Sequence, residues 1–217
     1  MGQAMNPASN NVLSRKTAFA KLAVSAALAA VMVFPASAAT TTWQIDPAHT
    51  AAGFAVKHLM ISTVRGQFKG VNGAVVWDDQ DISKSTIDVT IDAKTIDTSE
   101  PKRDEDLRSE KFFDTAKYPT ITFKSKKIEN VSAGKLKVTG DLTIRGVTKE
   151  VVLDIEGPSN PVKDPWGNTR IAASATTKVN RQDYGVKWNA NIDGGGVVVG
   201  DDVNITIDLE MIKKTAK

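Results

Sequence analysis

The chain has 217 residues, a formal net charge of +3 and no cysteine. The lack of cysteine excludes disulfide bonds and thiol chemistry. Three of the 28 basic residues and none of the 25 acidic residues precede residue 39, so the remainder is formally neutral and lacks the clustered positive charge that nucleic-acid binding needs.

The first 38 residues have the pattern of a secretory signal peptide. A basic region over residues 15–21 precedes an apolar run of 13 residues over 22–34, and Ala-Ser-Ala at 36–38 offers small residues for cleavage. An uncleaved membrane anchor is the alternative, but the apolar run is short for a bilayer. We therefore expect export, and one folded domain over residues 39–217 without stable membrane insertion.

Most of the remaining chain alternates between apolar and polar residues, which is typical of strands with one buried face. Before residue 99 this pattern predicts strands at residues 43–46, 51–59, 63–77 and 85–92. The third of these contains Gly66, Gly70 and Gly73. Glycines inside strands indicate bends or places where another segment comes close to the backbone.

The alternation stops between Ser99 and Phe123. Ser99 is expected to cap a short helix over residues 102–108, because its hydroxyl can accept a free N–H of the first turn. Leu107 is the only apolar residue of that helix, and Phe112 and Phe113 follow it directly. Two adjacent aromatics beside a charged helix need an apolar surface to enter. We interpret this segment as a lid over the mouth of a β-structure.

Five further strands are predicted after the lid, at residues 120–127, 135–144, 150–156, 170–179 and 203–211. The second and third are close enough in sequence to form a hairpin. Residues 158–167 contain three prolines and are expected to form a loop, and residues 180–191 are irregular.

The expected fold class is all-β, with about eight to ten antiparallel strands and one or two short helices. Closure into a barrel removes exposed strand edges, and a barrel of eight strands can hold one ligand. A flat sandwich is the alternative, because periodicity alone does not separate the two. The apolar side chains that would line a cavity are Phe54, Val56, Phe68, Ile87, Val89, Ile91, Phe112, Phe113, Ile121, Phe123, Leu142, Ile144, Tyr184 and Trp188. On the residues alone, a filled core is the favoured interpretation of this set.

Candidates for catalysis are few. The chain has two histidines and no Gly-x-Ser-x-Gly motif, so a nucleophile has no recognisable base beside it. The alternative is an envelope metalloprotein or enzyme in which Asp46, His49 and His58 supply a carboxylate and two imidazoles. Their spacing matches no standard zinc motif, and hydrogen bonds from each histidine to the backbone are the simpler interpretation. We expect no catalytic residue and no metal.

Five segments carry a family resemblance. In chain order they read TWQIDPAHTAAGFAVKHL, VRGQFKGVNG, RDEDLRSEKFFDTAKYPTITFKS, GDLTIRGVTKEVVLDI and NRQDYGVKWN. Together they span about residues 43–213, and they resemble segments of the YceI-like family of periplasmic polyisoprenoid-binding proteins.

This resemblance implies a lipocalin-like antiparallel barrel with a long apolar cavity. It implies a periplasmic carrier or scavenger of a polyisoprenoid, a polyprenyl quinone or a fatty amide, with envelope stress as one setting. The resemblance implies no catalytic activity and no nucleic-acid partner. It implies no cofactor other than a bound lipid or quinone, and it leaves open whether the protein forms a homodimer. A structural domain with a filled core is the remaining alternative.

Overall fold

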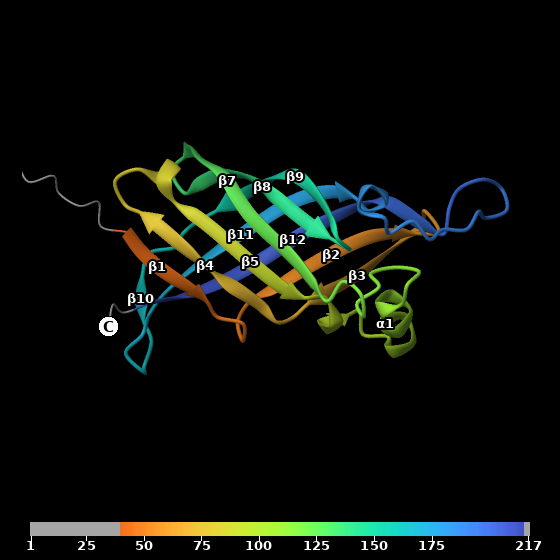
Figure 1. Ribbon diagram of the computed structural model, residues 1–217, viewed down its shortest axis with the longest axis horizontal. Helices are drawn as coiled ribbons and strands as arrows, with labels where there is room; N and C mark the ends of the chain where they lie inside the picture. Colours follow the sequence, from red (N-terminus) through yellow and green to blue (C-terminus); the bar gives the residue numbers. More distant parts are fainter. Residues whose placement is uncertain (1–39, 215–217) are drawn as a thin grey trace, which may run out of the picture. The chain divides into compact units, whose positions relative to one another are not determined.

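The computed structural model describes residues 40–214, and the predicted signal peptide at residues 1–38 lies outside this range. Twelve β-segments form one sheet (Figure 1). They are β1 (Thr40–Ile45), β2 (Ala51–His58), β3 (Ser62–Phe68), β4 (Val71–Asp78), β5 (Thr86–Asp92), β6 (Ile96–Asp97), β7 (Thr120–Ser132), β8 (Lys135–Ile144), β9 (Val147–Glu156), β10 (Val162–Lys163), β11 (Thr169–Asn180) and β12 (Val199–Lys213). The helical segments are α1 (Pro101–Arg108) and the 3-10 turns η1 (Ile82–Lys84), η2 (Ala93–Thr95) and η3 (Arg181–Tyr184).

The sheet closes on itself because the last strand returns to the first. β12 pairs with β11 from Asn180↔Asp202 to Arg170↔Ile212, and along its other edge it pairs with both β2 and β1. β1 and β2 therefore lie end to end along the same edge of β12 and form one bent strand of the barrel wall. β3 with β4, and β5 with β6, form two more bent wall strands beside this one. The result is a closed antiparallel barrel of eight wall strands, so the barrel prediction is confirmed and the sandwich is wrong.

The predicted strand at residues 63–77 is divided into β3 and β4 at Lys69 and Gly70. Gly66 lies within β3, and a Cβ atom there would come within 2.4 Å of the ring of Phe54. The ring of Phe54 therefore occupies space that only glycine leaves free. This confirms the expectation that glycines in this segment mark bends and close approaches.

The segments that follow β6 and β11 lie at the same end of the barrel, where Figure 1 shows α1 and the last long loop. The helix is confirmed, but Ser99 does not cap it. Glu100 is the cap, since its carboxylate accepts the N–H of Lys102 at 3.1 Å. Ser99 instead adopts a left-handed conformation with φ of 59°. No helix within residues 40–214 has both the length and the apolar character needed to cross a bilayer.

A buried carboxylate ties α1 to the barrel. Asp104 accepts hydrogen bonds from the backbone N–H and the hydroxyl of Thr98, at 2.8 and 2.5 Å. Arg103 donates to the same threonine, and Arg108 donates to the carbonyl of Ile96 at 3.2 Å. The sequence of this helix offers Leu107 as its only apolar anchor. It has polar anchors as well.

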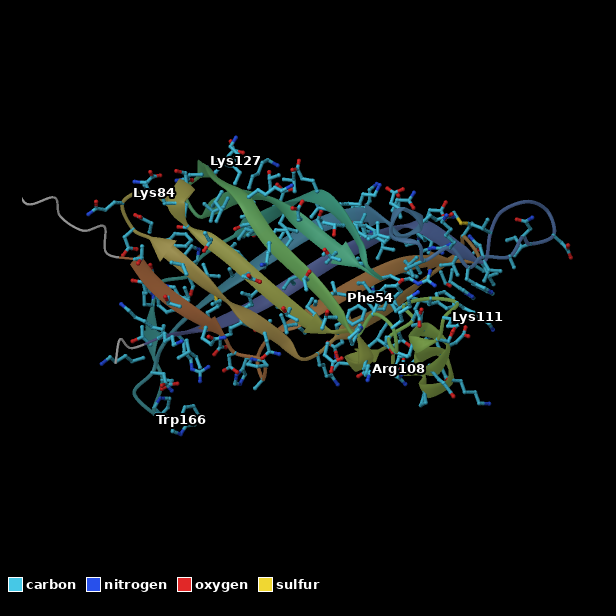
Figure 2. The ribbon with its side chains drawn as sticks, in the orientation of Figure 1. Phe54, Lys84, Arg108, Lys111, Lys127 and Trp166 are labelled. Carbon is cyan, nitrogen blue, oxygen red and sulfur yellow. The ribbon has the colours of Figure 1, made fainter. Side chains whose placement is uncertain are left out.

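Polar and apolar side chains divide between the two faces of the sheet, as the alternation predicts. Figure 2 shows Lys84, Lys127 and Trp166 projecting from the outside of the barrel, whereas Phe54 lies within it. Along β8 the buried positions are Leu136, Val138, Gly140 and Leu142, with exposed or half-buried residues between them. The inward faces of all wall strands therefore meet in one apolar interior.

Candidate functional site

The barrel encloses a cavity of about 230 Å³. Its wall is almost entirely apolar and includes residues from every wall strand. Trp77 and Met211 line it toward one end, and Val56 and Tyr184 line it toward the other, so the cavity runs along the barrel. Ligand sites of proteins are typically concave and apolar in this way.

The interior is not filled by its own side chains. Val203, Ile205, Ile207 and Leu209 of β12 line the cavity, yet each stays only half-buried. In a close-packed core such inward residues would be fully buried. The filled-core interpretation therefore does not describe this interior.

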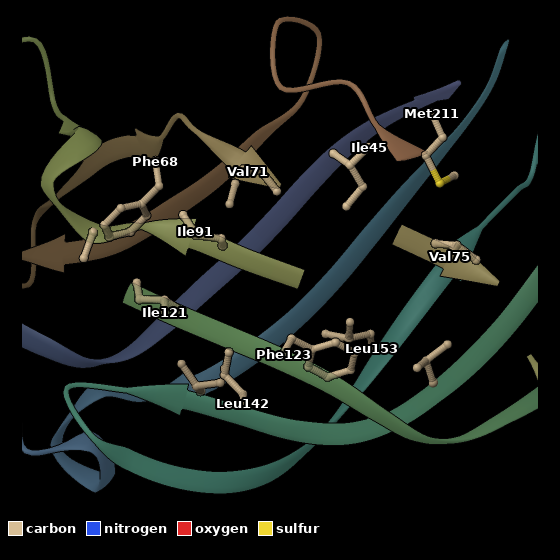
Figure 3. Close-up of a cluster of buried hydrophobic side chains, with 14 of the residues drawn as sticks. Ile45, Phe68, Val71, Val75, Ile91, Ile121, Phe123, Leu142, Leu153 and Met211 are labelled. Carbon is tan, nitrogen blue, oxygen red and sulfur yellow. The ribbon is translucent and has the colours of Figure 1, made fainter. Parts of the chain in front are cut away.

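Most of the predicted lining residues lie on this cavity. They are Phe54, Val56, Phe68, Ile87, Val89, Ile91, Phe112, Phe113, Ile121, Phe123, Leu142, Ile144 and Tyr184. Figure 3 shows Phe68, Ile91, Ile121, Phe123 and Leu142 reaching from four strands, β3, β5, β7 and β8, into one interior. Whether these side chains contact a ligand stays a prediction.

Trp188 was also predicted to line the cavity, and this is wrong. The residue is 37% exposed and its ring packs on Phe112 instead, with centroids 5.4 Å apart. The segment after η3 has no two-residue period, so its sequence did not indicate which aromatic faces inward. Val186, two residues earlier, is buried and lines the cavity.

The prediction missed a large part of the wall. The omitted residues include Val71, Val75, Trp77, Leu136, Leu153, Ile155, Ile171, Ala173, Ala175, Val179, Val186, Val203, Ile205, Ile207, Leu209 and Met211. The signal was present in the alternation of residues 170–179 and 203–211. In that alternation the small residues Ala173 and Ala175 fit either an open cavity or bulky neighbours, so the pattern alone does not decide between them.

Before β7 begins, the lid segment contributes three side chains to the cavity, Leu107, Phe112 and Phe113. Phe113 packs edge-on against Phe68, with centroids 5.4 Å apart, and Phe68 in turn packs against Phe54 at 5.7 Å. The aromatics after α1 thus continue the cavity wall across one end of the barrel. This agrees with the interpretation of residues 99–123 as a lid.

Among residues 40–214, Arg181 is the only charged residue that lines the cavity. Burial lowers its pKa, and the charge of Asp201 opposes that change. All five of its N–H groups are used: they donate to the carbonyl oxygens of Gly200 (2.8 Å), Val186 (2.6 Å), Trp188 (2.9 Å) and Val199 (3.1 Å) and to the carboxylate of Asp201 (3.4 Å). Its role is therefore to hold the chain after η3 in place.

Tyr184 is the other polar group at this end. It is only 2% exposed, and its hydroxyl has no hydrogen-bond partner within residues 40–214. Burial raises the pKa of Tyr184 to about 12, with a smaller contribution from Asp183. The phenol consequently keeps its proton at neutral pH and offers a buried O–H donor.

The proposed set of metal ligands does not assemble as the sequence suggested. Asp46 and His49 are 2.9 Å apart, but His58 lies at the far end of β2, roughly 23 Å along the strand from Ala51. Within residues 40–214, Glu210 instead completes a group with Asp46 and His49.

That group is already neutralised by an arginine. Arg170 donates to Asp46 at 2.6 Å and to Glu210 at 2.5 Å, and a third carboxylate, Asp164, accepts from its Nε at 2.7 Å. The hydrogen bonds from Arg170 and then from His49 lower the pKa of Asp46 to about 2. A metal ion would have to displace a guanidinium, so this donor set fits an ion-pair cluster better than a metal site.

Comparison with known proteins agrees with this geometry. The YceI-like domain matches residues 43–211. A UPF0312 protein of Vibrio cholerae is 36% identical over 169 residues, which are 77% of this chain and 89% of the relative.

Two solved structures share the fold. BcnA of Burkholderia cenocepacia has a TM-score of 0.65 at 22% identity, covering 76% of this chain and 98% of that one. A polyisoprenoid binding domain from Saccharophagus degradans has a TM-score of 0.56 at 15% identity, covering 79% and 98%. Because the domain match extends over most of the sequence, the chain belongs to the YceI-like family.

Proposed function

We propose that this protein binds a long apolar lipid inside the barrel and carries or scavenges it in the periplasm. The observation behind the proposal is the cavity, which is apolar, runs along the barrel and is left open by half-buried inward residues. No constellation for covalent chemistry accompanies it among residues 40–214, and we propose a binding protein rather than an enzyme.

The comparisons favour this class of ligand. The Saccharophagus degradans domain of the same fold is described as polyisoprenoid binding. A polyisoprenoid, a polyprenyl quinone or a fatty amide would each match an elongated apolar cavity. Burial contributes about 0.8 kcal/mol per CH₂.

The periplasmic location rests on the sequence before residue 39. Fractionation of cells followed by N-terminal sequencing tests it, with Ala39 or a close neighbour as the expected first residue. Recovery of the intact chain from the membrane fraction would contradict it.

The proposed function itself is tested by identifying what the protein holds. Protein purified from its native source without detergent would be extracted with organic solvent, and the extract analysed by mass spectrometry. We expect a stoichiometric lipid with a long hydrocarbon or isoprenoid chain. An extract without such a lipid, together with failure of the stripped protein to bind a fluorescent isoprenoid, would refute the proposal.

A further inference from the structure

The turn between β2 and β3 exposes large apolar side chains in a backbone conformation that disfavours them. Met60 is 54% exposed and Ile61 is 83% exposed. The central residues of the turn, Leu59 and Met60, have φ of 52° and 62°. Hairpin turns with positive φ at both central positions ordinarily carry Asn-Gly, because bulky side chains are strained there. Leucine and methionine therefore occupy positions at which folding alone favours other residues.

The long loop between η3 and β12 extends this apolar surface. Leu59 donates its N–H to the carbonyl of Val198 at 2.8 Å, so the turn lies beside the end of that loop. A Cβ atom at Gly196 would lie 3.4 Å from the side chain of Ile192 and 3.6 Å from that of Met60. These two side chains therefore border the same glycine. Figure 1 shows the loop projecting beyond the strands, at the end of the barrel that carries α1.

The turn and the loop, residues 57–65 and 187–198, are together called the tip. Its basic residues, all exposed, are Lys57, Arg65 and Lys187. None of the three pairs with a carboxylate among residues 40–214, whereas wall residues such as Lys124 and Lys137 do. The tip contains a single acid, Asp193. It thus combines exposed apolar side chains with an excess of unpaired positive charge.

We propose that the tip docks the protein on the surface of a lipid bilayer that contains anionic headgroups. Met60 and Ile61 enter the boundary between headgroups and acyl chains, and the basic residues contact the headgroups. Exposed apolar side chains with polar residues around them are typical of interaction sites. A surface contact of this kind also explains why the turn keeps two large apolar residues at positive φ.

The shape of the tip favours a bilayer over a protein partner. A stable protein interface buries about 800 Å² on each partner and has a closely packed core. The tip instead projects as a turn and a loop, and the glycines at 194–196 give that loop no side chains to fit a complementary surface. A bilayer accepts a projecting apolar side chain without matching its shape.

Docking at the tip places the lid beside the bilayer. Trp188, near the start of the loop, packs on Phe112 of the lid segment. The inference therefore adds to the proposed function the surface with which lipid would be exchanged. Docking itself requires no lipid in the cavity, so the two can be tested apart.

Flotation of the purified protein with vesicles measures docking. Vesicles of phosphatidylethanolamine and phosphatidylglycerol are compared with uncharged vesicles of phosphatidylcholine, both without isoprenoid lipid. We expect the parent to bind the anionic vesicles more tightly and to lose this preference at high salt. Ile61→Asp should bind them at least about tenfold more weakly, because it removes an apolar contact and adds a negative charge.

Val131→Asp is the matched control for Ile61→Asp. Val131 is also an exposed apolar residue, but it lies at the end of β7 remote from the lid segment. It should bind vesicles as the parent does. Because the chain has no cysteine, a polarity-sensitive dye can be attached to Ile61→Cys or to Val131→Cys alone. The dye at position 61 should brighten on anionic vesicles, and the dye at position 131 should not.

Met60→Gly separates docking from folding. Glycine suits the positive φ at this position, so the variant should unfold at the same denaturant concentration as the parent or a higher one. It should nevertheless bind anionic vesicles several-fold more weakly, since it lacks the apolar side chain. A less stable Met60→Gly protein would overturn the inference, because the side chain would then serve the fold.

Other results also overturn the inference. One is a parent protein that binds neither kind of vesicle, and another is equal binding by the parent, Ile61→Asp and Met60→Gly. A parent that sediments as a dimer, which Ile61→Asp dissociates, would show that the tip covers a second copy of the chain. Because the vesicles contain no isoprenoid, failure of docking is distinguishable from failure of the proposed lipid binding, which is measured in solution without vesicles.

Discussion

The ring of Phe112 packs against the ring of Trp188, with centroids 5.4 Å apart and planes inclined by 43°. Phe112 follows α1 and Trp188 follows η3, so this contact joins two segments that are distant in sequence. Arg145, in the turn between β8 and β9, adds a second connection by donating to the carbonyl oxygens of Glu110 (2.8 Å) and Gly185. Three segments therefore hold one another over one end of the cavity.

Truncating the lid aromatics tests whether they control ligand release. In Phe112→Ala and Phe113→Ala we expect at least one variant to release a fluorescent isoprenoid faster, because affinity changes of this kind act mostly on the off-rate. The empty protein should lose less than the about 3–5 kcal/mol that truncating a large aromatic usually costs in a filled core. Stopped-flow dissociation and denaturant unfolding measure the two quantities.

Phe123→Ala is the matched control for this pair. Phe123 lines the same cavity from within β7, where its ring lies against Gly140 of β8. It should lose more unfolding free energy than the lid variants. If both lid variants lose several kcal/mol and release is unchanged, Phe112 and Phe113 are ordinary core residues and the lid interpretation fails.

Filling the cavity should abolish binding without unfolding the protein. Ile207 points into the cavity from β12 and is only half-buried, so Ile207→Trp would place its ring in the open space. We expect affinity for a fluorescent isoprenoid to fall by more than about tenfold. Overpacking a filled core typically costs about 1–3 kcal/mol, and here the loss should be smaller.

Thr206→Trp is the control, because Thr206 is the exposed neighbour of Ile207 on the same strand. It should bind as the parent does. Unchanged binding in Ile207→Trp would show that the lipid is held elsewhere, whereas a large loss of stability would show that the cavity is not open at this point.

The strands of the barrel were predictable wherever apolar and polar residues alternate along them. Residues 135–144 and 150–156 form the expected hairpin, because each has one apolar face and the turn between them is short. The bends were not predictable in full. Gly70 indicates a break between β3 and β4, but the sequence does not show that the neighbouring wall strands bend alongside it. Such coordination depends on pairing between residues that are far apart in the chain.

The site was predictable where the period was regular and not elsewhere. Phe54, Ile91 and Phe123 were assigned correctly to the interior, since their neighbours alternate. Trp188 was not, since its segment lacks a period. The hydrogen bonds that Asp104 accepts from Thr98 could not be inferred either. An acidic residue on a charged helix gives the same sequence pattern whether it faces solvent or the N–H of Thr98.

Removing both histidines tests the metalloprotein alternative. His49 is 59% exposed at its side chain, and neither His49 nor His58 lines the cavity. The double variant His49→Ala, His58→Ala should therefore bind lipid within several-fold of the parent. The metal content of the native protein and of the double variant is measured by elemental analysis. Stoichiometric zinc or iron in the native protein, lost in the double variant together with lipid binding, would contradict this prediction and favour a metal site.

The cluster around Arg170 predicts a specific acid sensitivity. The pKa of Asp46 falls from its ordinary 3.8 to about 2, chiefly through Arg170. Burial raises the pKa of Asp164, but hydrogen bonds from Arg170 and Asn168 outweigh it and leave that pKa at about 2 as well. Carboxylates with a lowered folded-state pKa stabilise the protein above their ordinary pKa, and this stabilisation is lost as the pH falls from about 4 toward 2.

Substitution of the arginine should move that transition. In Arg170→Ala the two carboxylates lose their main donor, so their pKa values rise toward the ordinary range and acid unfolding should begin about one pH unit higher. Circular dichroism followed from pH 6 to pH 2 measures the midpoint. Arg65→Ala is the control, because Arg65 is exposed and pairs with no carboxylate among residues 40–214. Arg170 pairs with three carboxylates, those of Asp46, Asp164 and Glu210. If Arg170→Ala and the parent nevertheless unfold at the same pH, these ion pairs do not stabilise the packing of β11 and β12 against the end of β1.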